Sequence, residues 1–334
     1  MKLKLPIALI TLLLGIGTIA SGCSSTQPTS SSAESKTNTS TNETLDITVS
    51  IEPQKYFVEK IGGKNVSVNV MVPAGTEPHA YEPKPQQLRK ISEAEAYIII
   101  GSDTFEDAWM NRIKSANSSL LIVDSGKGIE RIKMVAHHHH HEEEEEKATK
   151  ESEEQGLDPH IWLAPSLVKK QAQNIYQGLV QLDPDRKEEY KQNLDSFLAE
   201  IDRTDREIRK NLAGVTNRKF IVFHPAWGYF SREYNLEQIP IEVEGTEPSA
   251  AELKELIEEA KEEKIQVIFV EPQFSTKSAQ SIAQEINARV VPINPLAANW
   301  SENLLKVSET FAKELSELDS SKVKVLIVLS FPHI

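Results

Sequence analysis

Three of the nine histidines stand alone in segments marked by proline, where their imidazoles could bind a metal ion. His79 lies in GTEPHAYEP, His160 in LDPHIWLAP and His224 in IVFHPAWGYF. Neutral imidazole is the commonest protein ligand for transition metals. Each histidine taken alone is more simply interpreted as a hydrogen-bonded structural residue. Because all three occupy the same kind of setting, the pattern predicts a three-histidine metal site.

A run of five histidines is followed directly by five glutamates, Glu142 to Glu146. One interpretation is a mobile auxiliary loop that captures or senses metal, with a lower affinity because binding must also order the loop. The other is a tolerated low-complexity insertion, since loop tips accept such sequence readily. The run consists of His137, His138, His139, His140 and His141, while the ninth histidine, His333, has no assigned role.

Short apolar runs alternate with helical patterns, which indicates parallel strands joined by helical crossovers. The first set of expected strands is 46–51, 66–72, 96–100 and 120–124, with a helix at 85–95. The second set is 219–223, 265–270 and 289–293, with helices at 250–263 and 275–287. The sequence therefore predicts an α/β fold of two lobes, each a mainly parallel sheet flanked by helices.

A long helix is expected to join the two lobes as a rigid connector. Asp183 is a candidate N-cap, Pro184 suits the first helical position, and Gly214 is a plausible stop. One apolar stripe follows the helical period, through Tyr190, Leu194, Phe197, Leu198, Ile201, Ile208 and Leu212. A long helix packed within one lobe would give the same pattern.

These elements place the three histidines at the junction of the lobes. The expected boundaries are 45–182 for the first lobe, with the His/Glu-rich loop at 136–156, then 183–213 for the helix and 214–334 for the second lobe. His79 and His160 belong to the first lobe, and His224 ends a strand of the second. Ligands bind at the carboxyl ends of strands in open α/β sheets, so the site is expected in the cleft between lobes.

The amino terminus has the features of an exported, lipid-anchored protein. Residues 1–22 combine Lys2 and Lys4 with a 16-residue apolar stretch, Leu5 to Ala20, which fits a secretory signal. Cys23, the only cysteine, follows Ala20-Ser21-Gly22, which resembles a lipobox except that Ala20 stands where that motif usually has leucine. Lipidation of Cys23 is expected. Residues 23–44 are polar and predict a disordered tether to a body on the outer face of the membrane. An ordinary signal or an uncleaved anchor would also fit this segment.

The net charge of −13 argues against nucleic-acid binding, which needs a basic surface. A length of 334 residues is sufficient for two domains. The acidic balance is compatible with collecting cations, although solubility alone is enough to explain it.

The segments around the histidines resemble the cluster A-I solute-binding proteins, which deliver zinc or manganese to ABC importers. The similarity lies in GTEPHAYEP, DPHIWLAP, FHPAWGYF, EGTEPSAAEL and VIFVEPQFS, from about residue 46 to the carboxyl terminus. It implies two α/β lobes, metal bound between them by His79, His160 and His224, and as partners an ABC permease with its ATPase subunit. A monomer is expected.

The resemblance also bears on the metal and on its fourth ligand. Manganese-type members usually have a carboxylate where this sequence has His224, and three imidazoles suit zinc better than harder ions. The family often supplies an aspartate where this chain has Asn294, and an amide is a poor zinc ligand. The fourth position is left open between water, Glu77, Glu271 and Asn294.

The sequence thus predicts an extracytoplasmic protein that captures Zn²⁺ as transported cargo and is not an enzyme. The main rival hypothesis is a three-histidine zinc hydrolase or lyase, in which the metal would activate a water molecule. The chain has no HExxH motif and no GxSxG motif, which weighs against such an enzyme. Two further hypotheses are transport of manganese or another divalent metal, and an adhesin or surface zinc buffer that works without a transporter.

Overall fold

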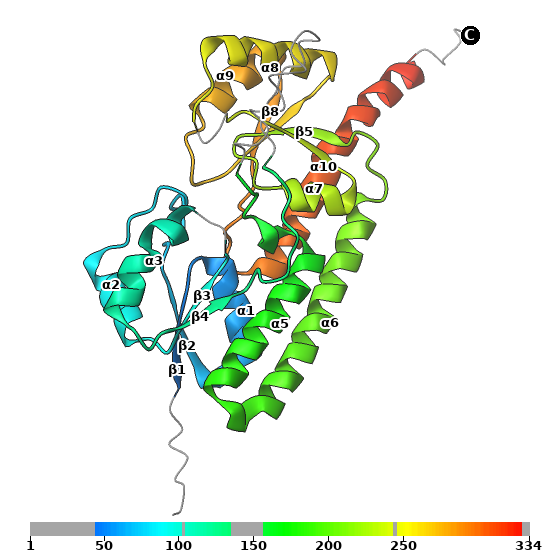
Figure 1. Ribbon diagram of the computed structural model, residues 1–334. Coiled ribbons are helices and arrows are strands. Elements are labelled where there is room, and N and C mark those ends of the chain that lie inside the picture. Colours follow the sequence, from blue (N-terminus) through cyan, green and yellow to red (C-terminus); the bar gives the residue numbers. More distant parts are fainter. Residues whose placement is uncertain (1–43, 102–103, 135–155, 243–245, 329–334) are drawn as a thin grey trace, which may run out of the picture. The chain divides into compact units, whose positions relative to one another are not determined.

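Two four-stranded sheets, both wholly parallel, organise the chain (Figure 1). The computed structural model describes residues 44–101, 104–134, 156–242 and 246–328, with side chains described as far as residue 316. The two-lobe α/β prediction is confirmed, and the first lobe is defined here by the first sheet and the second lobe by the second.

The first sheet has the strand order β2-β1-β3-β4 and helices on both faces. Its strands are β1 (Leu45–Val49), β2 (Val66–Val70), β3 (Ala96–Ile99) and β4 (Leu121–Asp124). The helices are α1 (Glu52–Gly62), α2 (Pro85–Glu93), α3 (Thr104–Ala116) and α5 (Pro165–Leu182). α2 and α3 pack together on one side of the sheet and α1 and α5 on the other (Figure 1). Burial on both faces explains the nearly continuous apolar runs.

The second sheet has the order β6-β5-β7-β8. Its strands are β5 (Lys219–Val222), β6 (Glu237–Pro240), β7 (Val267–Val270) and β8 (Arg289–Pro292). Its helices are α7 (Gly228–Tyr234), α8 (Ala250–Glu262) and α9 (Lys277–Ile286), of which α8 and α9 pack against each other. A separate apolar cluster fills the space between these two helices and the sheet.

Strand β6 is an element that the apolar pattern did not predict. It contains Glu237, Gln238 and Pro240 in four residues, so it has no apolar run. Proline lacks an amide proton and is tolerated in edge strands, and β6 is the edge of its sheet. The strand matters for the site because Glu242 lies two residues beyond its end.

The long helix predicted at 183–213 is present as α6 (Lys187–Leu212), preceded by a 3₁₀ turn, η3 (Pro184–Arg186). Asp183 is the N-cap of η3 and Pro184 its first residue, as predicted, although the Asp183 side chain makes no capping hydrogen bond. Its carboxylate instead accepts from Arg186 Nη1 at 2.5 Å and from the Tyr190 hydroxyl at 3.2 Å. The helix stops just before Gly214, as predicted, and its apolar stripe is buried on α1, α5 and α10 (Trp300–Val328).

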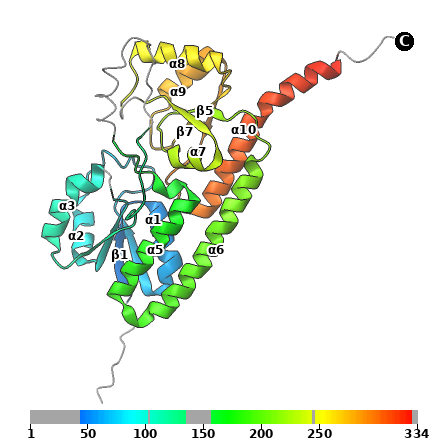
Figure 2. The same cartoon turned by 45° about the vertical axis from the view of Figure 1, so that its right-hand side comes forward.

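Helix α10 also belongs to both lobes (Figure 2). Trp300, at its first turn, packs edge-on against Phe57 of α1 and Phe197 of α6. Three turns later Phe311 lies among Phe220, Phe230 and Phe269 of the second lobe. One continuous core therefore runs through both lobes, and the chain from Asn42 to Ile334 forms one compact unit.

In the part of the chain that the structure describes, no helix combines the length and the apolar character needed to cross a membrane.

Candidate metal centre

His79 is carried by the loop between β2 and α2, and a neighbouring carboxylate shapes that loop. Glu77 Oε1 accepts a hydrogen bond from the His79 backbone N–H at 2.5 Å, and its Oε2 accepts from Ala80 N–H at 2.8 Å. Such local bonds stabilise a turn without a regular element. His79 itself is half-buried, which makes it the most solvent-accessible of the three histidines.

His160 is fixed by the aspartate two residues before it. Asp158 Oδ1 accepts from both the His160 backbone N–H and the ring Nδ1, each at 2.8 Å. The next residues form a short 3₁₀ turn, η2 (Ile161–Leu163), that leads into α5. The Trp162 ring lies 5.1 Å from the His160 ring, and His160 is only 3% exposed. With Nδ1 donating to the carboxylate, Nε2 is the nitrogen left to bind a metal.

His224 follows β5 and is held in a similar way. Its Nδ1 donates to Glu242 Oε2 at 3.0 Å, and its backbone N–H donates to Glu271 Oε2 at 3.2 Å. The Phe274 ring is stacked on the imidazole, with centroids 4.8 Å apart and planes 21° apart. His224 is 4% exposed, so its ring has little freedom to turn.

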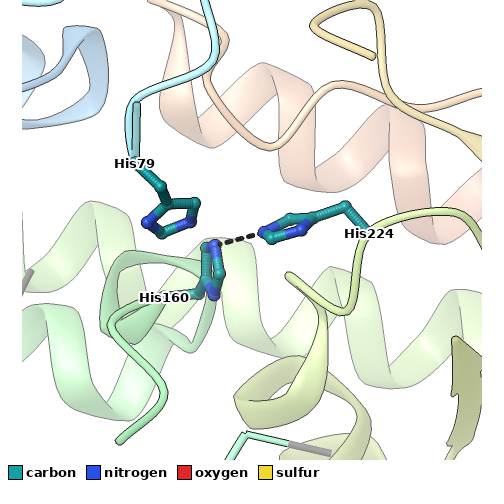
Figure 3. Close-up of side chains that lie close together, drawn as sticks. All are labelled: His79, His160 and His224. Carbon is teal, nitrogen blue, oxygen red and sulfur yellow. Dashed lines mark hydrogen bonds between the residues drawn. The ribbon is translucent and has the colours of Figure 1, made fainter. Parts of the chain in front are cut away.

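The three imidazoles converge from three separate segments of the chain (Figure 3). His160 Nε2 lies 3.2 Å from His224 Nε2, and one potential ligand atom of each histidine lies within 4.8 Å of the others. Tetrahedral Zn²⁺ with bonds of about 2.0–2.1 Å places its ligand nitrogens about 3.3 Å apart. The two buried histidines already have this spacing. His79 needs an adjustment of at most about 1.5 Å, which a loop can supply.

Two carboxyl groups beside the histidines are strongly affected by burial. Burial raises the pKa of Asp158 to about 7, although the His160 backbone N–H and the nearby imidazoles act in the opposite direction. Burial also raises the pKa of Glu271 well above its ordinary value, while the His224 backbone N–H lowers it. Perturbed carboxyl groups of this kind are frequent at functional sites.

The remaining candidate ligands are engaged in different contacts. Both Glu77 oxygens accept backbone N–H groups. Asn294 Oδ1 accepts from Gln273 Nε2 at 2.9 Å and from Leu296 N–H at 3.0 Å, which uses both of its lone pairs. Glu271 is fully buried, and its Oε2 accepts from the His224 backbone N–H. Among the described residues, only the three histidines form a group of potential ligand side chains.

Sequence reasoning missed Asp158, Glu242 and Phe274. Asp158 had a signal, because it stands in the same DPH segment as His160. Glu242 could not be found without β6, since it reaches His224 only through the pairing of β6 with β5. Cys23, the run His137–His141 and His333 lie outside the described residues.

A family model and a curated relative that match this chain are both named for zinc uptake. The model of the family "Zinc-uptake complex component A periplasmic" (ZnuA) matches residues 47–320. The high-affinity zinc uptake system protein ZnuA of Bacillus subtilis is 31% identical over 275 residues, which is 80% of this chain and 82% of that protein.

Solved structures agree with the sequence match. A crystal structure of ZnuA is 50% identical and superposes with a TM-score of 0.74, covering 81% of this chain and 99% of that one. A ZnuA deletion mutant with zinc bound gives the same identity and TM-score, covering 82% and 98%. At this identity the likeness extends beyond the fold to the family.

Proposed function

Since the chain belongs to the ZnuA family of zinc-uptake components, we propose that it captures Zn²⁺ between its lobes and delivers it to an ABC-type permease. The observation that carries the proposal is the convergence of His79, His160 and His224 from both lobes onto one point. The zinc-bound structure of a 50% identical relative supports the same metal.

We assign the three histidines as the zinc ligands, with Nε2 as the binding atom of His160 and His224. Three imidazoles favour zinc over manganese, because harder ions favour carboxylate ligands. A water molecule is proposed for the fourth position, since Glu77 and Asn294 are already engaged and Glu271 does not join the histidine group.

The binding cycle needs only small movements. The core is continuous through both lobes, and α6 and α10 each contact both, so wide closure would break packed contacts. His79 is the most exposed of the three histidines, so we expect its loop to make the adjustment. In this cycle the protein takes up Zn²⁺, docks on the permease with its ATPase subunit, and releases the ion into the translocation path.

The decisive experiment measures zinc binding and turnover on the same protein. One tightly bound Zn²⁺ per chain, with zinc found on the three histidines in a crystal, is the expected result. The rival hypothesis is a zinc hydrolase or lyase. Hydrolysis or hydration of model substrates that disappears when the zinc is chelated would overturn the carrier function.

The amino-terminal assignments complete the proposal. Residues 1–22 act as a signal peptide, Cys23 carries the lipid, and residues 23–44 separate it from the first lobe, 45–182. The connecting helix is 183–213 and the second lobe 214–334. The protein acts as a monomer on the outer face of the membrane. Retention of wild-type protein in a membrane fraction, with release of a Cys23→Ser variant, tests the anchor.

The histidine–glutamate run is proposed as an auxiliary zinc-capturing segment. Deletion of residues 137–146 is expected to leave the single tight zinc site unchanged, because none of its three ligands lies there. Weak additional binding should disappear. Titration of both proteins with zinc in the presence of a competing chelator measures the two effects, and loss of the tight site in the deletion would contradict the assignment.

Zinc affinity is expected to decrease as the pH falls below about 7. The imidazoles must be neutral to bind the metal, and Asp158, whose pKa is raised to about 7, accepts the Nδ1 proton best as a carboxylate. Protonation of either group therefore competes with zinc. Affinity measured across this pH range should fall on the acid side, and a pH-independent affinity would contradict the expectation.

A further inference from the structure

The two buried histidines are supported by a matched pair of carboxylates, one in each lobe. Asp158 accepts the His160 Nδ1 proton and is 1% exposed. Glu242 accepts the His224 Nδ1 proton and is 5% exposed. The two carboxylates come from unrelated segments, the loop before α5 and the end of β6. The same contact is therefore built twice.

This arrangement decides which nitrogen of each ring faces the metal. A neutral imidazole carries one proton, and the carboxylate keeps it on Nδ1, so that the lone pair is on Nε2. Both Nε2 atoms then point into the space between the rings, 3.2 Å apart. Without the carboxylates, each ring could flip or change tautomer and present the wrong atom.

We propose that Asp158 and Glu242 are positioning residues for zinc. They hold the Nδ1–H of His160 and of His224, so that both Nε2 atoms face the zinc when it binds, and their two negative charges offset the charge of the buried dication. The proposal deepens the proposed function and depends on it. Neither residue touches the metal in this account.

The second lobe also contacts Asp158, the carboxylate that orients His160 of the first lobe. The Tyr229 hydroxyl of α7 donates to the Asp158 backbone oxygen at 3.0 Å. A Cβ on the neighbouring Gly228 would lie 2.6 Å from Asp158 Oδ2. Gly228 therefore leaves room for the carboxylate, and a methyl group there would displace it. Residues of one lobe thus hold the partner of a ligand in the other.

Five variants of the full chain separate these roles. Asp158→Ala and Glu242→Ala remove the acceptors, and Gly228→Ala displaces Asp158 without changing it. Asp158→Asn is the conservative variant. Its side-chain oxygen should stay in place because the same Oδ1 also accepts the His160 backbone N–H. Glu314→Gln is the matched control, since Glu314 is 5% exposed and is paired with Arg289 at 2.6 Å.

Zinc affinity is measured by competition with a chelator, and the protonation of each imidazole nitrogen by ¹H–¹⁵N NMR of the zinc-loaded proteins. The two alanine variants are expected to bind zinc about 10- to 100-fold more weakly. Gly228→Ala should weaken binding in the same direction. Their spectra should lose the pattern of protonated Nδ1 and zinc-bound Nε2 at the affected histidine. Asp158→Asn should keep this pattern and recover part of the affinity, while Glu314→Gln changes neither.

The outcomes distinguish this proposal from the proposed function. If the wild-type protein binds zinc tightly but both alanine variants bind equally well with unchanged imidazole spectra, the positioning role is overturned and the carrier function stands. If the wild-type protein binds no zinc tightly, the positioning role and the carrier function both fail. Should an alanine variant fold poorly, Asp158→Asn and Gly228→Ala decide the matter, because both keep the buried volume filled.

Discussion

Replacing His224 with alanine is expected to lower the zinc affinity of the protein at least about tenfold. The change removes one of three convergent nitrogens and leaves Glu242 without the Nδ1–H that it accepts. It also opens a space beside the stacked Phe274 ring. Comparable losses are expected for His79→Ala and His160→Ala. Competition titration with a chelator of known zinc affinity measures each constant.

His333→Ala is the matched control, because His333 has no proposed role. Its affinity should equal that of the wild type. One result would contradict the assignment. If the three substitutions left tight zinc binding intact while deletion of residues 137–146 abolished it, the tight site would lie in the histidine run. The roles assigned to the two sets of histidines would then be reversed.

Replacing Trp300 with alanine is expected to lower the free energy of unfolding by about 3–5 kcal/mol. Trp300 is 2% exposed and packs against Phe57 and Phe197. Its indole N–H also donates to the Trp162 backbone oxygen at 2.6 Å. The substitution therefore leaves a cavity and a buried carbonyl without its donor. Urea unfolding of the apo protein, followed by tryptophan fluorescence and circular dichroism, measures the loss.

Two further variants show whether the decrease in the free energy of unfolding comes from the buried indole of Trp300. Trp300→Phe keeps an aromatic ring but removes the N–H donor and part of the indole volume, so it should cost less than the alanine variant. Leu157→Ala changes a side chain that is 49% exposed and should alter stability by less than about 0.5 kcal/mol. An equal effect of Trp300→Ala and Leu157→Ala would show that the start of α10 does not contribute to the shared core.

The fold could be predicted from sequence wherever burial left a periodic pattern. Strands covered on both faces, such as β7, are apolar throughout, and α6 repeats its apolar residues at helical spacing. The pattern failed at β6, an edge strand with few apolar residues. At Asp183 the pattern found the N-cap position, but the Asp183 carboxylate accepts from a nearby arginine and tyrosine and makes no capping bond.

The candidate site divides in the same way. His79, His160 and His224 could be selected because each stands in a distinct local setting, and the structure brings them together. Glu242 could not be selected from the sequence, because its contact with His224 depends on the pairing of β5 with β6. Local sequence indicates which side chains are suited to chemistry. Only the tertiary fold shows which groups orient them.

Trp300 also has a consequence for the order in which the protein is assembled. The core around Phe57, near the start of the first lobe, is completed by a side chain from the last helix. As the protein folds after the proposed export, β1 to β4 can form early, but that core cannot close until α10 has docked. We therefore expect the first lobe to remain loosely packed and protease-sensitive until α10 is in place.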